Sequence, residues 1–240
     1  MLRDLERARE AVTASGTGIV GRVAIGLPTT VTPVLATPLL QAAFASLPDV
    51  TIHLVESHSG FLREWLDTFR LDVAVLFNIT EAQGLELTPL IAEQLYLVSR
   101  STATRGRPIT LREIGKLDLI MSSRPHDLRK TLDSAMMLAS GHQLRIKAEI
   151  DSLATIKQMV AAGLGQTILP LSAARSELAA GKLAARRIIR PVIERHAAIA
   201  CVSRRPRTRA QQAVASLILE IANRLIASGD WTGRRLHKLK

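Results

Sequence analysis

The chain has 240 residues, 47% of them hydrophobic, which is enough to bury the core of one domain or of two small lobes. Its single cysteine excludes an internal disulfide and fits a reducing cytoplasm. No apolar run approaches the roughly 20 residues of a bilayer span. The net charge is +11, but only 3% of the residues are aromatic, which argues against a stacking surface for single-stranded nucleic acid.

Predicted strands and helices alternate along the chain. Residues 1–17 are predicted to be the end of a helix followed by a Ser/Gly linker. Strands are then predicted near 19–27, 50–56, 73–77, 85–99, 117–121, 144–150, 167–169, 183–189 and 196–203, and helices near 34–47, 61–69, 125–139, 153–162 and 209–226. Such alternation predicts an α/β fold with parallel sheets and right-handed crossovers.

The same order of elements occurs twice, which predicts two lobes. We expect the first lobe to comprise residues 18–100 and 202–227, and the second to comprise residues 101–201. The polar segment 102–108 is the candidate hinge between them. Residues 228–240 form a basic tail with few apolar side chains, which we expect to be disordered.

Segment 150–170 (IDSLATIKQMVAAGLGQTILP) is the most informative stretch of the chain. Asp151 and Ser152 stand where the next helix needs N-caps. Gly163 ends that helix, because glycine accepts the left-handed conformation of a C-terminal cap. The Gly-Leu-Gly sequence joins a helix to a strand, whereas dinucleotide loops run from a strand into a helix, so it does not indicate a nucleotide site.

Polar side chains gather at the predicted strand-to-helix junctions. In a two-lobed α/β protein these junctions meet at the carboxyl ends of the strands, where ligands bind. Hydroxyls and free N–H groups at helix N-termini favour an anionic ligand, to which an arginine and a histidine would add charge. The candidate ligand-binding residues are Thr29, Thr30, Ser57, Asn78, Ser122, Arg124, His126, Asp151 and Ser152. For each Ser, Thr and Asp, a simple capping role is the alternative.

Other chemistry finds little support in the sequence. No serine has a nucleophile-elbow context, and no carboxylate pair stands out as catalytic. His53 and His58 are five positions apart and would face opposite sides of a continuous strand. Because no second cluster of ligands accompanies them, we expect no metal site. Cys201 lies in an apolar run and is expected to be a core residue.

Three parts of the sequence resemble one known family. They are 21–30 (GRVAIGLPTT), 39–56 (LLQAAFASLPDVTIHLVE) with 71–76 (LDVAVL), and the segment 150–170. In this order they resemble the effector-binding domain of LysR-type transcriptional regulators, over residues 18–226. Residues 122–129 (SSRPHDLR) are similar to the branch of nitrogen-assimilation control regulators.

The resemblance implies two Rossmann-like lobes, arranged as in type 2 periplasmic binding proteins, with a ligand cleft between them. It implies a cytoplasmic regulator and not an enzyme, which binds a small anionic metabolite and needs no cofactor. DNA binding would belong to an N-terminal helix-turn-helix that this sequence lacks, since residues 1–14 resemble only the end of its linker helix. No membrane partner is implied.

The resemblance also implies a homodimer or homotetramer. The helix near 34–44 of one subunit is expected to pack antiparallel against the helix near 153–162 of its partner. The predicted interface residues are Val34, Leu35, Leu39, Ala43, Ile156, Met159 and Val160.

Two other functions share this fold. The first alternative is a stand-alone solute-binding protein for transport, although the charged N-terminus is unlike a secretory signal. The second is a small-molecule enzyme, for which the sequence supplies no matched acid, base and nucleophile.

Overall fold

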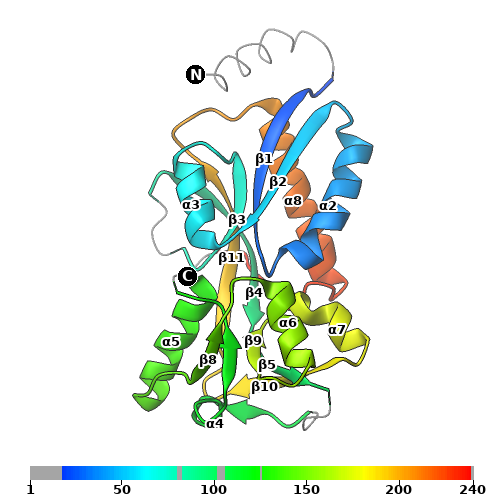
Figure 1. Ribbon diagram of the computed structural model, residues 1–240. Helices are drawn as coiled ribbons and strands as arrows, with labels where there is room; N and C mark the ends of the chain where they lie inside the picture. The colour runs from blue at the N-terminus through cyan, green and yellow to red at the C-terminus, as the bar shows by residue number, and fades with distance from the viewer. Residues whose placement is uncertain (1–17, 80–82, 102–105, 125, 239–240) are drawn as a thin grey trace.

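A computed structural model describes residues 18–79, 83–101, 106–124 and 126–238. They form two lobes, one above the other, each with strands at its centre and helices outside (Figure 1). The prediction of a helix and linker at residues 1–17 lies outside this part of the chain. No helix among the described residues has the length and apolar character needed to cross a membrane.

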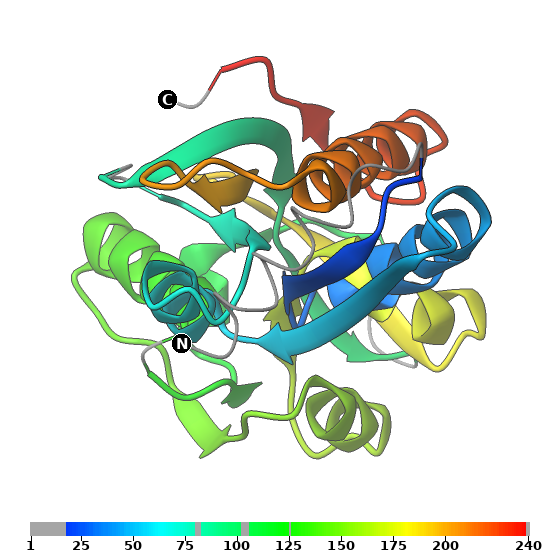
Figure 2. The same cartoon turned by 90° about the horizontal axis from the view of Figure 1, so that it is seen from above.

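The first lobe is built on a six-stranded sheet in the order β12-β4-β11-β3-β1-β2. Its strands are β1 (Gly21–Pro28), β2 (Val50–Ser57), β3 (Val73–Phe77), β4 (Leu85–Gln94), β11 (Glu194–Val202) and β12 (Arg234–Arg235). Helices α2 (Thr32–Ser46) and α8 (Arg209–Ala227) lie on one face and α3 (Ser59–Asp67) lies on the other (Figure 2).

Strand β1 has apolar side chains on both of its faces, which explains why helices cover both faces of this sheet. Side chains alternate along a strand, so Val23 and Ile25 pack with α2 and α8, while Ala24 packs with Leu62 of α3. Helix α8 begins with a capping box, in which the Thr208 hydroxyl accepts a hydrogen bond from the backbone N–H of Gln211.

The second lobe contains a four-stranded sheet, β6-β10-β5-β9, and a parallel pair, β7-β8, joined by a bridge between Leu119 and Gln166. The strands are β5 (Tyr96–Arg100), β6 (Ile109–Thr110), β7 (Leu119–Met121), β8 (Ile146–Glu149), β9 (Thr167–Leu169) and β10 (Leu183–Ile189). The helices are α4 (Leu111–Ile114), α5 (Asp127–Ser140), α6 (Leu153–Ala161), the 3₁₀ helix η1 (Leu171–Ala174) and α7 (Arg175–Ala179).

The chain passes between the lobes at Leu95 and again at residues 190–193, and both expected lobe boundaries are therefore displaced. Strand β5 belongs to the second lobe, and β11 pairs with β3 and β4 in the first. The expected hinge at 102–108, whose first four residues are outside the described part, is not where the chain crosses. Because the chain crosses twice, the six-stranded and four-stranded sheets contain both parallel and antiparallel pairs, and the prediction of parallel sheets holds only for the pair β7-β8.

The prediction that the C-terminal tail is disordered is also wrong for residues 228–238. Trp231 is fully buried in the core of the first lobe, and β12 pairs antiparallel with β4. The indole N–H of Trp231 donates a 3.0 Å hydrogen bond to the buried carboxylate of Glu93. One large aromatic side chain with a buried acceptor thus anchors a segment that is otherwise basic.

Most of the residues predicted for the dimer interface are buried within their own lobe. These are Val34, Leu35, Leu39 and Ala43 of α2 and Ile156 and Val160 of α6, with exposures of 0–8%, whereas Met159 is half-buried. The apolar stripe of each helix packs against the core of its own lobe. These six side chains therefore have little surface left for contact with a second subunit.

Candidate functional site

A pocket lies between the two lobes, at the carboxyl ends of the strands. Six of the nine predicted ligand-binding residues line it: Thr29, Thr30 and Ser57 from the first lobe, and Ser122, His126 and Asp151 from the second. Its free volume is about 40 Å³. A water molecule needs roughly 10–15 Å³ of such space, so this closed arrangement admits only a few water-sized groups.

Four helices begin around this pocket. Thr29 and Thr30 precede α2, His58 is the N-cap of α3, His126 that of α5 and Ser152 that of α6. Helices α2, α3 and α5 have no side-chain capping bond. The N-cap of α2 is Val31, which has no polar side chain, and the side chains of His58 and His126 do not bond to the N–H groups of α3 and α5. The first N–H groups of these helices therefore face the region of the cleft.

Arg195 lines the pocket and belongs to a buried ion pair. Arg195 of β11 is paired with Glu93 of β4, donates a 2.5 Å hydrogen bond to the Thr30 hydroxyl, and lies 3.7 Å from the ring centre of Phe77. Burial lowers the pKa of the Arg195 guanidinium, and the Glu93 carboxylate opposes that shift. The charge of Arg195 is thus already matched, and its role is to hold Thr30 at the pocket wall.

Asp151 does not cap a helix. It joins the loop after β8 to the loop after β7 within the second lobe. Its carboxylate accepts hydrogen bonds from the backbone N–H of Ser123 at 2.9 Å and from the Ser123 hydroxyl at 2.7 Å. These two bonds lower the pKa of Asp151, so the group is ionised at neutral pH. Capping of α6 falls to Ser152 alone, which accepts from the N–H of Thr155.

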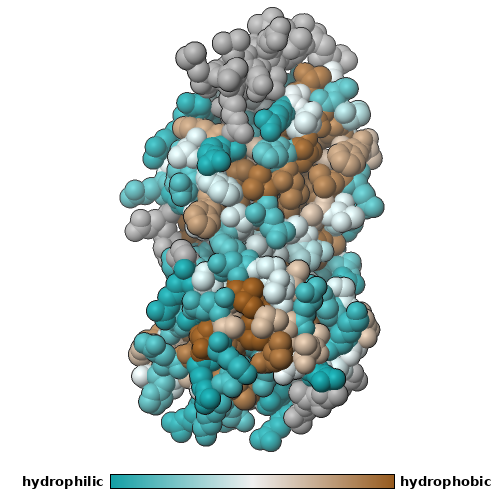
Figure 3. Space-filling model, viewed as in Figure 1, coloured by the Kyte–Doolittle hydropathy of each residue, from teal (hydrophilic) through white to brown (hydrophobic). Residues whose placement is uncertain are grey.

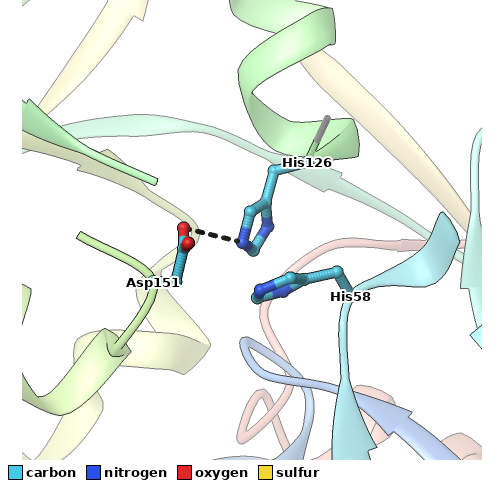
Figure 4. A group of neighbouring side chains, drawn as sticks. All are labelled: His58, His126 and Asp151. Carbon is cyan, nitrogen blue, oxygen red and sulfur yellow. Dashed lines mark ion pairs between the residues drawn. The ribbon is translucent and has the colours of Figure 1, made fainter. Parts of the chain in front are cut away.

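Two histidines from opposite lobes meet beside Asp151 (Figure 4). The ring centres of His58 and His126 are 3.1 Å apart, and Nε2 of His126 is 3.6 Å from a carboxylate oxygen of Asp151. Burial lowers the pKa of His58, and burial together with the neighbouring His58 lowers that of His126 to about 4. Both imidazoles are therefore neutral at pH 7.

Three predicted residues lie away from the pocket lining. Arg124 is exposed and paired with Asp133 at 2.8 Å, so its charge is directed to α5. Ser152 is exposed and acts as a cap. Asn78 instead joins the lobes, because its amide nitrogen donates to the Thr131 hydroxyl of α5 at 3.0 Å.

No sequence pattern identified Arg195, Glu93 or His58 as a residue of the site. Both members of the ion pair are charged residues inside apolar strands, a signal that predicts a buried pair without naming the partner. His58 and His126 are 68 positions apart, and no spacing rule connects them.

Comparisons with known proteins identify the family. Residues 16–223 match the LysR substrate binding domain. The chain belongs to this family. It is 32% identical over 225 residues to the nitrogen assimilation regulatory protein nac of Klebsiella aerogenes, covering 93% of this chain and 73% of that protein. The protein of the same name from Escherichia coli K12 is 33% identical over 177 residues, which span 73% of this chain and 57% of that protein.

Solved structures share the fold of this LysR substrate-binding domain. A Corynebacterium glutamicum OxyR C206 mutant matches with a TM-score of 0.77 at 24% identity, covering 100% of this chain and 76% of that chain. The effector binding domain of QuiR in complex with shikimate matches with a TM-score of 0.74 at 18% identity, covering 86% and 99%. The predicted family and two-lobed α/β fold are confirmed, and the likeness to nac agrees with segment 122–129. The chain is the effector-binding domain of a LysR-type regulator.

Proposed function

We propose that the cleft binds a small anionic metabolite and that binding changes how the two lobes meet. The observation that carries this proposal is the convergence of six polar residues, three from each lobe, on one pocket. A ligand that contacts both lobes stabilises whichever relative orientation allows both sets of contacts at once.

The anionic character is supported by helix N-termini that no side chain caps and by one hydroxyl without a partner among the described residues. The N-termini of α2, α3 and α5 carry no side-chain caps, and such termini attract negative charge. The buried hydroxyl of Ser122 makes no hydrogen bond to any described residue. The QuiR domain, which has the same fold, was solved with shikimate, a small carboxylic acid.

Entry of a metabolite requires the lobes to separate, because the closed pocket has only about 40 Å³ of free volume. The two crossings at Leu95 and at residues 190–193 connect the lobes and are the natural axis of such a movement. In a full regulator, we propose, the movement reaches DNA-binding domains through contacts between subunits.

Apolar surface suited to such contacts lies on both lobes. Phe44 of α2 is 67% exposed, and Leu164, just beyond α6, is 52% exposed. In the space-filling view, apolar side chains gather over the upper lobe near β2 and α2, and a second group lies in the lower lobe (Figure 3). These outer residues, in place of the buried ones, are the proposed dimer contacts.

A panel of small mono-, di- and tricarboxylic acids, with neutral sugars and amines of similar size, tests the ligand class by calorimetry. Anionic compounds are expected to bind, and Ser122→Ala is expected to weaken binding about threefold to tenfold, the value of one hydrogen bond of about 0.5–1.5 kcal/mol. Global stability should change little, because the hydroxyl has no partner among the described residues.

Ser152→Ala is the matched control. It removes a serine of the neighbouring junction that caps α6 without lining the pocket. We expect it to lower the free energy of unfolding by about 1 kcal/mol and to leave ligand affinity unchanged. Binding of neutral compounds only would contradict the anionic class, and equal affinity in Ser122→Ala and wild type would contradict the assigned pocket.

A further inference from the structure

Three residues of the pocket lining, His58, His126 and Asp151, lie close enough together to hold a metal ion. One ligand atom from each lies within 4.8 Å of the other two. His58 comes from the first lobe, at the end of β2, whereas His126 and Asp151 come from the second, before α5 and after β8. Figure 4 shows the three side chains converging on one point from separate elements.

Each imidazole has a buried ring nitrogen without a hydrogen-bond partner among the described residues. Nδ1 of His58 and Nε2 of His126 are buried, and neither makes a hydrogen bond to any residue that the structure describes. His126 as a whole is only 9% exposed. A buried polar atom without a partner costs free energy, and a bound ion would satisfy it.

The charges around the histidines favour a cation over an anion. Asp151 places a carboxylate oxygen 3.6 Å from Nε2 of His126, and Glu56 and Asp127 stand two and one positions from the two histidines. The nearby positive group, Arg195, is already paired with Glu93. The Asp151 carboxylate therefore brings negative charge to the point where the two imidazoles meet.

One distance already fits a tetrahedral ion. Ligand atoms about 2.0–2.1 Å from zinc lie roughly 3.4 Å from one another, and Nε2 of His126 is 3.6 Å from the Asp151 oxygen. The ring centres of His58 and His126, 3.1 Å apart in this closed arrangement, would have to separate to roughly 5 Å, which a movement between the lobes provides because the two rings come from opposite lobes. Imidazole and carboxylate together suit Zn²⁺ better than Mg²⁺ or Ca²⁺, which prefer oxygen ligands alone.

We propose that His58, His126 and Asp151 bind one Zn²⁺ ion across the cleft, with its fourth position open to an anionic ligand. The ion ties the two lobes together, because one of its ligands comes from the first and two come from the second. It also reconciles an anionic effector with the carboxylates of the pocket, since the effector would meet the positive charge of the ion. The inference deepens the proposed function by naming a ligand of the same cleft.

Zn²⁺ and Co²⁺, each added alone to the metal-free 240-residue chain, test the proposal. Calorimetry is expected to give one saturable Zn²⁺ site per chain, and Co²⁺ to give the strong visible absorption of four-coordinate cobalt. His126→Asn, His58→Ala and Asp151→Asn are each expected to weaken Zn²⁺ binding about 100-fold or more, because each removes one of three protein ligands. Asp151→Asn keeps an acceptor for Ser123, so its effect reports the lost charge and not a lost fold.

His53→Ala is the matched control, since His53 is an exposed histidine of β2, five residues before His58. It should bind Zn²⁺ as the wild type does. Circular dichroism of every variant excludes unfolding as the cause of a loss. The proposal is overturned if the wild type has no saturable site, or if Zn²⁺ binds equally to the wild type and all three ligand variants.

The carboxylate panel, repeated with and without Zn²⁺, separates this inference from the proposed function. Tighter anion binding with Zn²⁺ present supports both. A second outcome is anion binding that depends on Ser122 but is the same with and without Zn²⁺ and persists in His126→Asn. This outcome overturns the metal site and still supports the effector cleft. Zn²⁺ binding without binding of any anion supports the metal site and contradicts the anionic effector.

Discussion

The ion pair between Glu93 and Arg195 joins the pocket to the core of the first lobe. Glu93 is 0% exposed, and its two oxygens accept from the Arg195 guanidinium and from the Trp231 indole. Arg195 in turn holds the Thr30 hydroxyl. Burying two charges costs solvation, which the protein recovers only while every one of these contacts is intact.

Replacing Glu93 with alanine should therefore strongly lower the free energy of unfolding. Glu93→Ala leaves Arg195 buried without its counter-charge and removes the acceptor of Trp231, so we expect a loss of about 3–5 kcal/mol in the free energy of unfolding. Glu86→Ala is the comparison, because Glu86 forms an exposed pair with Arg207, for which about 0–1 kcal/mol is expected. Urea unfolding of both variants measures the difference, and equal losses would contradict the role given to the buried pair.

Among the secondary-structure elements, β12 and the turn before it complete the first lobe from the far end of the chain. Strand β12 covers the edge of β4, and Trp231 packs with α8 and the sheet. The segment also reaches the second lobe, where Asp230 pairs with Arg175 of α7. An edge strand that would otherwise be open is thereby protected.

Trp231→Ala tests how far this segment supports the fold. Removing a fully buried tryptophan is expected to cost about 3–5 kcal/mol. Trp65→Ala, at a half-buried position of α3, should cost clearly less. Thermal unfolding followed by circular dichroism gives both values. Similar midpoints for the two variants would mean that the C-terminal segment contributes little to stability.

Strands and helices with a clear run or period of apolar residues could be predicted from the sequence. The apolar runs of β3 and β9 fall at the predicted residues, since a short buried strand shows its full length in hydropathy. The pairing of strands could not be predicted, because the sheet that takes up β11 depends on where the chain crosses between lobes. Trp231 was missed because a single buried aromatic side chain leaves no periodic signal.

The candidate site could be predicted only at the level of junctions. Thr30 follows β1 and Ser122 follows β7, and both line the pocket because the carboxyl ends of these strands face it from the two lobes, which is a property of topology. Which side chains turn inward depends on partners distant in the sequence. Arg124 turns away because Asp133 on α5 binds it, and Asp151 leaves its cap position because Ser123 offers two donors.

On the scale of the whole molecule, α2 belongs to the first lobe and α6 to the second (Figure 1). A two-fold dimer that packs α2 of one subunit against α6 of the other would use both helices of each subunit. Leu39, which the sequence analysis assigned to such a contact, is 0% exposed. Its replacement by arginine would break the core of the subunit and could not report on assembly.

Phe44→Glu is the variant that separates assembly from folding. Phe44 is 67% exposed, so a carboxylate there keeps its water in the free subunit but would lie against apolar surface in the proposed dimer. We expect light scattering to show monomers near 26.1 kDa at concentrations where the wild type is dimeric, while circular dichroism shows the secondary structure of the wild type. Leu138→Glu is the control, because Leu138 of α5 is 89% exposed and lies outside the proposed contact. If Phe44→Glu stays dimeric, or if Leu138→Glu dissociates as readily, the subunits meet through another face.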